Sequence, residues 1–465
     1  MRSRLFMFAA CWIATLCAAG LIGACTSLPR IHPDMAPVRD GAVQVSGANG
    51  PLSAARSRAV LDGLKGRGSE TNIFDRHLAL EEAVAGTPLV AGNKVLLLQD
   101  GPATYQAMFA AIREARDHIN MESYIIEDDE VGAQFSQALI ARQQQGVQVN
   151  LIYDAVGSMN TPPEFFKRLT DAGVKVLQFH PINPLAAKAG WNVNQRDHRK
   201  LLVIDGRVAF LGGINISSVY SGGSAGSRPT GKPGSGLPWR DTQVRIEGPV
   251  VADFQKLFLD NWAHEKGDAL AQRNYFPALT NKGNLVVRCI GGSPDEPYSA
   301  IYATLISAIG SAETEVLLSN AYFAPDPQLL EALKSAVKRG VDVKLLLPSK
   351  HDSGLVFHAG RSYYDELLSA GIKIYERKTA LLHSKTVLID GVWSTVGSTN
   401  LDWRSFLHNQ EITAVVLGPD FGAQMKAAFE RDLAESQPII LEAWQQRTLG
   451  FRMKESLARM WEYWL

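Results

Sequence analysis

Apolar residues along the chain recur in two similar series of segments. The runs "VQVNLIYD" (residues 147–154) and "VDVKLLLP" (residues 341–348) are rich enough in Val, Ile and Leu to be buried strands. Each run follows a helix-like pattern, which begins near Val131 in the first series and near Pro327 in the second. Helices that alternate with buried strands predict an α/β layered fold, and the repetition predicts two similar α/β domains packed together.

The correspondence continues beyond these runs. "FFKRLTDAGVKVLQF" (residues 165–179) matches "YYDELLSAGIKIYER" (residues 363–377), so each half reads helix, Gly, strand, helix, Ala-Gly, strand. We place the first domain at residues 86–268 and the second at residues 283–436, followed by an amphipathic helical segment at 437–465. Two domains are the ordinary expectation for a chain of 465 residues.

Each half then contains one polar motif inside an apolar stretch. "DHRKLLVIDGRVAFLGGIN", from Asp197, can be laid over "LHSKTVLIDGVWSTVGSTN", from Leu382, without a gap. The matched positions are His198 and His383, Lys200 and Lys385, Asp205 and Asp390, Gly212 and Gly397, Gly213 and Ser398, and Asn215 and Asn400. Among these six pairs, only the Gly213 and Ser398 pair differs in residue type.

The motif has the chemistry of a phosphate site. "LLVID" and "TVLID" are strand-like, so His and Lys two residues apart share one face. A neutral His is a nucleophile and base near pH 7, Lys supplies positive charge, and an Asn amide donates hydrogen bonds. A single copy is equally typical of a surface His beside a salt-bridged Lys. Two copies, one in each half, instead favour one reaction that uses a nucleophile and a separate proton donor.

Charge and composition narrow the function. The chain is 46% hydrophobic and 20% charged, with a formal net charge of zero. Residues 1–24 contain Arg2 and Arg4 and no acid, so the remainder carries two net negative charges. A general nucleic-acid binder needs many unpaired cations, and we therefore expect no nucleic-acid partner.

The amino terminus "MRSRLFMFAACWIATLCAAGLIGAC" is typical of a secretory signal, with a basic start and an uncharged apolar run. Its end, "LIGAC", resembles the lipobox of bacterial lipoproteins, which implies a lipoprotein signal peptide at residues 1–24 and lipidation of Cys25. An uncleaved membrane anchor is the alternative. Thr26 stands where inner-membrane lipoproteins often carry Asp, which favours the outer membrane over the inner one. In either case the body lies outside the cytoplasm.

Residues 25–85 are interpreted as a tether, because they are rich in Pro, Gly, Ser and Arg up to about Thr71 and lack sustained apolar periodicity. Cys11, Cys17 and Cys25 belong to the signal region, so Cys289 is left without an internal disulfide partner. It lies in the strand-like "LVVRCI", where a small buried residue is expected.

The first half carries two insertions that the second half lacks. "PINPLAAKAGWNVN" (residues 181–194) is apolar for a loop, and it is either a packed flap or a lipid-facing wall that includes Trp191. Residues 220–238 have the composition of a flexible loop. Their "GGSAG" matches the G-x-S-x-G motif of serine hydrolases, but that motif requires a strand before it and a helix after it. We therefore reject it.

The paired HxKxxxxD and G[GS]xN motifs resemble those of the phospholipase D superfamily. The segments "ESYIIEDDEVG", "WRDTQVRIEGPVV", "NAYFAPD" and "GSTNLDWRSFLHNQE" narrow the resemblance to bacterial cardiolipin synthases of the phospholipase D type. It extends from about Asn93 to the carboxyl end. It implies a phospholipase D fold, with two domains related by a pseudo-two-fold axis and the active site at their interface.

The resemblance also implies a two-step transfer through a phosphohistidine. His198 is then the nucleophile and His383 the acid/base, although the pseudo-symmetry leaves the reverse assignment open. Lys200, Lys385, Asn215 and Asn400 would hold the phosphoryl oxygens. Asp241 and Glu411 match the acids that orient the two histidines, whereas Asp205 and Asp390 belong to the motif in a more structural role. No metal or other cofactor is implied.

Three functions compete at this point. The first is a phosphatidyltransferase that joins two phosphatidylglycerol molecules into cardiolipin and glycerol, the second is a phospholipid hydrolase, and the third is a nuclease-like phosphodiesterase. The quoted segments favour the first. The partners expected are phosphatidylglycerol and a membrane surface, with no obligate protein partner.

The carboxyl end "RMKESLARMWEYWL" (residues 452–465) places apolar residues on one side if it is helical. Those residues are Leu457, Met460, Trp461 and Trp464. Either this side packs on the second domain, or its tryptophans, together with Trp191, dip into a lipid interface beside the active-site mouth.

Overall fold

The computed structural model describes residues 43–65, 73–183, 185, 191–222 and 238–464. The chain divides into two units, Met1–Arg30 and Ile31–Leu465, and every described residue belongs to the second. The expected signal peptide, Cys25, residues 25–42 of the tether and most of the "GGSAG" segment lie outside the described residues. Within the described part, no helix combines the length and the apolarity needed to cross a membrane.

The first half builds a seven-strand arrangement in the order β3-β11-β9-β8-β4-β5-β6. Neighbours are antiparallel from β3 to β4 and parallel from β4 to β6. The strands are β3 Leu89–Gln99, β4 His118–Ser123, β5 Gln148–Asp154, β6 Lys175–Phe179, β8 Lys200–Ile204, β9 Val208–Gly212 and β11 Thr242–Glu247. The run predicted as the first buried strand is thus confirmed as β5.

The second half repeats this order as β12-β19-β18-β17-β13-β14-β15, with the same directions. The strands are β12 Leu285–Gly292, β13 Glu315–Asn320, β14 Asp342–Pro348, β15 Lys373–Arg377, β17 Lys385–Ile389, β18 Trp393–Gly397 and β19 Asn409–Leu417. A short strand, β20 Ser436–Pro438, adds to the outer edge of β15. The predicted repeat of two similar α/β halves is confirmed strand by strand.

The two halves meet at β3. Its later residues pair with β11, while Val90 and Asn93 pair with β12, so the described strands form one continuous 18-stranded sheet and one separate strand pair. Side chains of both halves share a single core between them, for example Val244 and Ile246 of the first half with Ala414 and Val416 of the second. Strand β9 also contacts β18 and β19, so both polar motifs lie at the junction of the halves.

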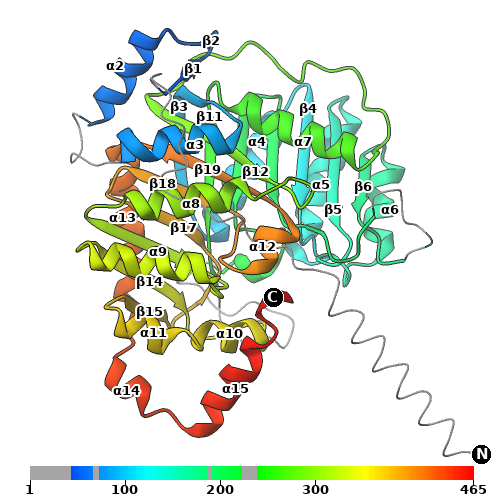
Figure 1. Cartoon of the computed structure of the whole chain (residues 1–465). Helices are drawn as coiled ribbons and strands as arrows, with labels where there is room; N and C mark the ends of the chain where they lie inside the picture. The colour runs from blue at the N-terminus through cyan, green and yellow to red at the C-terminus, as the bar shows by residue number, and fades with distance from the viewer. Residues whose placement is uncertain (1–42, 66–72, 184, 186–190, 223–237, 465) are drawn as a thin grey trace, which may run out of the picture. The chain divides into compact units, whose positions relative to one another are not determined.

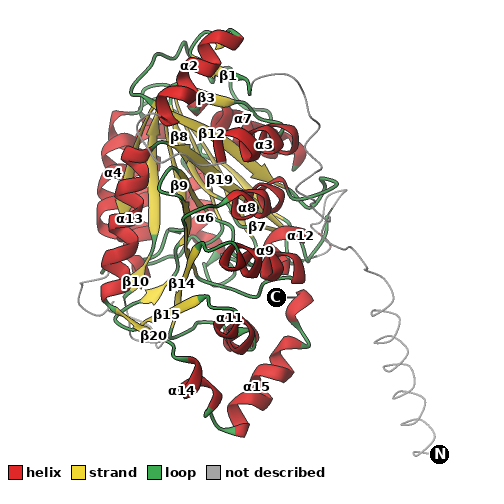
Figure 2. Ribbon diagram, turned by 60° about the vertical axis from the view of Figure 1, so that its left-hand side comes forward, coloured by secondary structure: helices red, strands yellow, loops and turns green. Residues whose placement is uncertain are grey.

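Helices cover the strands on both sides. Figure 2 shows α4 and α13 on one side and α3, α7, α8 and α9 on the other. The helices of the two halves are α4 Asp100–Glu114, α5 Glu130–Gln144, α6 Pro163–Asp171, α7 Val251–His264, α8 Ala300–Ser311, α9 Pro327–Lys338, α10 Gly354–Arg361, α11 Tyr364–Ser369, α12 Trp403–Leu407 and α13 Pro419–Ala434. Asp129 and Asp326 cap α5 and α9 by accepting backbone N–H groups, which explains why these helices begin where the sequence pattern begins.

The tether prediction is wrong for residues 43–65 and 73–85. These residues form β1 Val45–Gly47, β2 Gly50–Pro51, α2 Ala54–Lys65, the π-helical turn Ile73–His77 and α3 Leu78–Ala85. Helix α3 lies along α8 (Figure 1), and His77 contacts Ser307 at 2.9 Å through Nδ1. The charged Glu81 of α3 is fully buried near Arg288.

The carboxyl-terminal segment is helical in three short pieces and not in one. They are α14 Leu441–Gln445, α15 Leu449–Arg459 and the 3-10 turn η5 Glu462–Trp464. Two smaller expectations also have outcomes. Cys289 is a buried residue of β12, as predicted. The Trp191 indole donates to the carbonyl of Pro181 at 2.8 Å, and this contact leaves open whether its loop is a flap or a lipid-facing wall.

Candidate active site

The two motif histidines are each held by a strand of the opposite half. Strand β7 (Arg196–Asp197) pairs in parallel with the start of β19, and β16 (Leu381–Leu382) pairs in parallel with β10 (Trp239–Arg240). Each pairing ends with the backbone N–H of the His. His198 donates to the Gln410 carbonyl at 2.9 Å, and His383 donates to the Arg240 carbonyl at 2.8 Å.

This exchange places a carboxylate from the other half on each ring. His198 Nδ1 lies 3.0 and 3.2 Å from the two carboxylate oxygens of Glu411, and His383 Nδ1 lies 2.7 Å from Asp241 Oδ2. All four side chains are buried. A carboxylate on Nδ1 makes that nitrogen the proton carrier and leaves Nε2 with the reactive lone pair. The sequence predicted both acids, and the structure places each on the His of the opposite motif.

The carboxylates are themselves fixed in position. Glu411 accepts hydrogen bonds from the Ser398 hydroxyl and from the Asn409 amide, the latter at 3.3 Å. Burial raises the pKa of Glu411, but His198 and Lys200 more than offset this, so the pKa is lowered and Glu411 stays charged. Asp241 accepts from the backbone N–H of Thr242 at 2.6 Å. Both acids are therefore built to hold a histidine ring.

The two motif lysines are buried beside the histidines. Lys200 Nζ donates to the His198 carbonyl at 2.5 Å, and Lys385 Nζ lies 2.8 and 3.0 Å from the ring nitrogens of His383. Burial lowers the pKa of Lys200 to about 7 and that of Lys385 to about 8. Lys385 also lowers the pKa values of Lys200 and His198, which shows that both motifs act on one electrostatic site.

The histidines differ in their electrostatic surroundings. Burial lowers the pKa of His198 to about 4 against the opposing effect of Glu411, and both Lys200 and Lys385 lower it further. Burial and Lys385 also lower the pKa of His383, but there the carboxylates of Asp241 and Asp352 oppose the shift. His198 is therefore a neutral imidazole near pH 7, as a nucleophile must be.

The sequence of the chain matches a family model described as "Cardiolipin synthase, PLD-like domain" at residues 108–220 and 305–433. The chain is 36% identical over 386 residues to a cardiolipin synthase of Geobacillus sp. (strain WCH70), which covers 82% of the chain and 74% of that protein. It is also 34% identical over 372 residues to the major cardiolipin synthase of Bacillus subtilis (strain 168), covering 79% of the chain and 74% of that protein.

The chain belongs to the cardiolipin synthase family. A phosphatidylserine synthase of Haemophilus influenzae is similar in fold, with a TM-score of 0.63 at 13% identity over 84% of this chain and 100% of that one. The resemblance seen in the motifs is confirmed at the level of the family, and the expected two-part phospholipase D fold is confirmed with it.

Within this family site, the two Asn residues are not equivalent. Both polar atoms of the Asn215 amide are hydrogen-bonded within the protein. Its Oδ1 accepts from the Ile125 N–H at 3.1 Å, and its Nδ2 donates to the Tyr220 hydroxyl at 3.0 Å. Asn400 is buried, and its Oδ1 has no hydrogen-bond partner among the described residues. The Asn400 amide is therefore the freer of the two to turn toward a ligand.

Asp205 and Asp390 lie at the far ends of β8 and β17 from the histidines and lysines. Both have a left-handed backbone, with φ of 52° and 50°, in the turn to the next strand. The Asp205 carboxylate accepts the backbone N–H groups of residues 116–118, and the Asp390 carboxylate accepts those of residues 313–315. Both carboxylates therefore stabilise turns, which is the structural role expected for these two motif positions.

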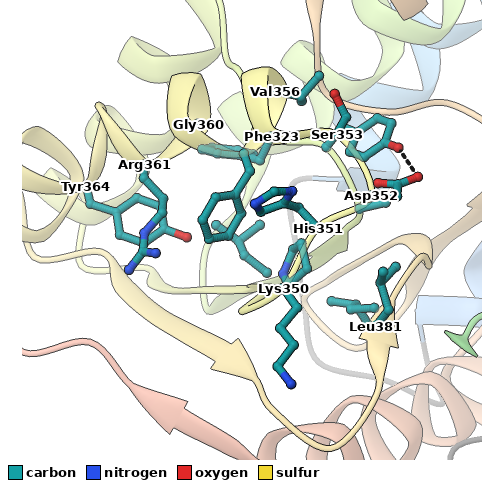
Figure 3. A pocket seen from close by; sticks show the side chains of 16 residues that line it. Phe323, Lys350, His351, Asp352, Ser353, Val356, Gly360, Arg361, Tyr364 and Leu381 are labelled. Carbon is teal, nitrogen blue, oxygen red and sulfur yellow. Dashed lines mark hydrogen bonds between the residues drawn. The ribbon is translucent and has the colours of Figure 1, made fainter. Parts of the chain in front are cut away.

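Several aromatic and acidic residues around His383 were not predicted. The Tyr220 hydroxyl lies 3.3 Å from His383 Nδ1, and the Trp239 ring lies 5.0 Å from the imidazole. Tyr322 donates to Asp352 at 2.6 Å and belongs to the quoted "NAYFAPD" segment. A cavity of about 410 Å³ opens here (Figure 3), lined by Tyr322, Asp352 and Leu382 among others. Among the described residues, no group of His, Cys, Asp and Glu is arranged to hold a metal.

Proposed function

We propose that the protein is a phosphatidyltransferase that joins two phosphatidylglycerol molecules into one cardiolipin and one glycerol. The observation that supports this most is the exchange of carboxylates, which gives two histidines, each with an acid on Nδ1, and two buried lysines in one site. Two separately held imidazoles suit a reaction in which one attacks phosphorus and the other moves protons.

In the first step, His198 Nε2 attacks the phosphorus of one phosphatidylglycerol. The P–N bond forms, the P–O bond to the glycerol headgroup breaks, and His383 gives its proton to the departing glycerol oxygen. The surroundings of the rings support these roles, because burial together with Lys200 and Lys385 lowers the pKa of His198 to about 4, whereas at His383 the carboxylates of Asp241 and Asp352 oppose the lowering caused by burial and Lys385.

In the second step, a headgroup hydroxyl of another phosphatidylglycerol attacks the phosphohistidine. His383 takes the hydroxyl proton, the new P–O bond forms, and the P–N bond to His198 breaks. Lys200, Lys385 and the Asn400 amide would stabilise the charge on the phosphoryl oxygens in both steps. The lysines take up protons when the anion binds, since an adjacent phosphate favours their charged form.

Hydrolysis, with water as the acceptor, is the alternative from the same site. Expression in a host that makes phosphatidylglycerol but no cardiolipin separates the two, with lipid mass spectrometry as the measurement. Cardiolipin should appear with the active chain and be absent with His198→Ala. Accumulation of phosphatidic acid without cardiolipin would establish the hydrolase instead.

We further propose that the protein is a lipoprotein anchored through Cys25, with its catalytic body outside the cytoplasm. The basic start, the apolar run and "LIGAC" support this proposal. A lipoprotein Cys carries several acyl chains, which hold more firmly than the single chain that gives only marginal binding. Cys25→Ser should accumulate as a larger, uncleaved precursor on a gel. Unchanged size and processing would favour the plain anchor.

A further inference from the structure

Large apolar side chains are exposed along α15 and the short segment that follows it. They are Leu449, Met453, Leu457, Met460, Trp461 and Trp464, with exposed fractions of 73, 57, 60, 77, 58 and 43%. The first three lie at intervals of four residues on one side of α15, and the other three follow in the turn and in η5. The six together are here called the C-terminal apolar surface. Exposed apolar side chains that are contiguous rather than scattered mark an interaction site.

The opposite side of the same segment contacts the second half of the protein through hydrogen bonds and ion pairs. Arg447 bonds Glu455 at 2.9 Å and Asp365 at 2.6 Å, and the Tyr363 hydroxyl donates to Glu462. Ala458 is buried on this side, where α15 packs along α10. In Figures 1 and 2, α14 and α15 project beyond α11 and α10. The C-terminal apolar surface therefore points away from the body because the other side is occupied.

Two contacts connect this surface to the active site. The Tyr463 ring lies 5.8 Å from that of Trp403, which begins α12 three residues after Asn400. Helix α10 contributes Val356 and Arg361 to the cavity of Figure 3, whose wall also includes Leu382, the residue before His383. A partner that binds the surface is thus brought next to the residues that flank both Asn400 and His383.

The charges around the surface indicate an anionic partner. Arg452 and Lys454 are exposed among the apolar residues. The two acids of the stretch are turned to the body, where Glu455 pairs with Arg447, and Glu462 accepts from Tyr363 and pairs with Arg459 at 3.7 Å. Exposed tryptophans beside cations are typical of segments that lie in the headgroup region of a membrane. A second copy of the chain would bring the same cations face to face, which disfavours self-association.

We propose that the C-terminal apolar surface docks on an anionic phospholipid bilayer and sets the active site beside the headgroups. The proposal rests on the proposed function only for the choice of phosphatidylglycerol as the lipid, and binding is therefore measured separately from turnover. The tryptophans enter the interface, Arg452 and Lys454 meet lipid phosphates, and the cavity beside Leu382 faces the same lipid layer.

The first measurement is the quenching of tryptophan emission in the full chain by phosphatidylglycerol vesicles with brominated acyl chains. Emission should be quenched, and Trp461→Phe with Trp464→Phe should remove most of the quenched fraction. Trp393→Phe is the control, because that ring is fully buried in the second half and should contribute none of the quenching. Unchanged quenching in the Trp461 and Trp464 double variant, in a chain that still turns over lipid, would overturn the proposal.

The second measurement compares Met453→Ser with Leu457→Ser against a matched pair elsewhere, Leu96→Ser with Met159→Ser, which are also exposed. The first pair should lower turnover on phosphatidylglycerol vesicles by about tenfold or more, because two apolar side chains no longer enter the bilayer. Turnover on detergent-dispersed lipid should be unchanged, and the control pair should match the unaltered chain in both assays.

These readouts keep the two proposals apart. Quenching that depends on Trp461 and Trp464, without any cardiolipin formed, would support docking and refute the proposed function. If sedimentation instead shows a lipid-free dimer that Met453→Ser with Leu457→Ser dissociates, the surface is an interface between copies and the docking proposal is wrong.

Discussion

In the first motif, Gly213 lies against Asp241, whereas in the second motif Ser398 lies against Glu411. A Cβ added at Gly213 would come within 2.3 and 2.5 Å of the Asp241 carboxylate oxygens, so only Gly fits there. At the matching place in the second half, the Ser398 hydroxyl fills the space and donates to Glu411. The one difference among the six matched motif positions is therefore paired with a second difference, a shorter acid in one half and a longer acid in the other.

The comparison shows that a repeated motif does not make repeated chemistry. Glu411, which holds His198, has three hydrogen-bond partners, and Asp241 holds a His383 that is also touched by Lys385 and Tyr220. His198 carries one carboxylate and has the Tyr124 ring 5.0 Å away, whereas His383 has Lys385 on its ring nitrogens and two aromatic rings, Tyr220 and Trp239, beside it. The repeat supplies two histidines, and the different residues around each ring suit them to different roles in the reaction.

Removal of either histidine is the change with the largest expected effect. His198→Ala and His383→Ala should each lower turnover about 10⁴-fold or more, because neither ring can do the other's task in the same step. Acid-labile phosphate should be trapped on His198 in the His383→Ala variant. Phosphate found on His383 in the His198→Ala variant would reverse the assignment of roles, and full activity in either variant would remove the mechanism.

Gly213→Ser should cost about 100-fold in turnover, because the new Cβ displaces the carboxylate that holds the His383 ring. The sharper experiment is the double variant Gly213→Ser with Asp241→Glu, which rebuilds in the first half the residue pair of the second. It should recover part of the lost turnover if a Ser–Glu pair can hold a histidine as well as a Gly–Asp pair does. If Gly213→Ser turns over lipid as fast as the unaltered chain, then Asp241 does not require a Gly at position 213.

The sequence predicted the repeat, the strands, both histidines and both acids, because buried strands and short motifs are local patterns. It could not assign Glu411 to His198, since that depends on the parallel pairing of β7 with β19 across more than 200 residues. Asp352 had no local signal, as it reaches His383 only through the fold. A structural role of Asp205 and Asp390 was expected from the motif, but their backbone partners at residues 116–118 and 313–315 were not, because these lie far away in the sequence.

Helix α3 was missed for a physical reason of another kind. Burial raises the pKa of Glu81, but Arg288 and His77 more than compensate, so a charged residue occupies the core side of the helix. Such a pair cannot be recognised from one partner alone. The left-handed Gly86 at the end of the helix was the available signal.

The lysines should give the site an alkaline limit. The pKa values of Lys200 and Lys385 are about 7 and about 8, so both lose their protons as the pH rises through this range. kcat/KM, which reports the free enzyme, should fall about tenfold per pH unit between these values and about a hundredfold per unit above both. Lys385→Arg should make the fall shallower, because Arg keeps its charge and only Lys200 still loses a proton.

Stability should change in the opposite direction over the same range. A Lys with a folded pKa below its unfolded value binds fewer protons when folded, so the free energy of unfolding rises with pH from about 7 toward 10. Melting temperatures measured across this range test the sign. A melting temperature that falls together with kcat/KM would show that activity is lost by unfolding and not by deprotonation.

The smallest effect is expected at Ser398, which acts on His198 only through Glu411. Ser398→Ala removes one donor to a buried carboxylate, while Asn409 and His198 remain as partners. A hydrogen bond to a charged group contributes about 1.5–3 kcal/mol, so a loss of about tenfold in kcat is expected where one partner is lost and two remain. KM should stay constant because Ser398 does not touch the lipid in this mechanism. Ser394→Ala is the matched control, since Ser394 is buried like Ser398, lies in β18, which ends just before Ser398, and has a hydroxyl without a partner in the described part of the chain. If both variants lower kcat equally, the Ser398 hydroxyl is only a packing group. A loss of kcat confined to Ser398→Ala would establish Ser398 as a residue that positions Glu411, a role that Gly213 cannot have in the first motif.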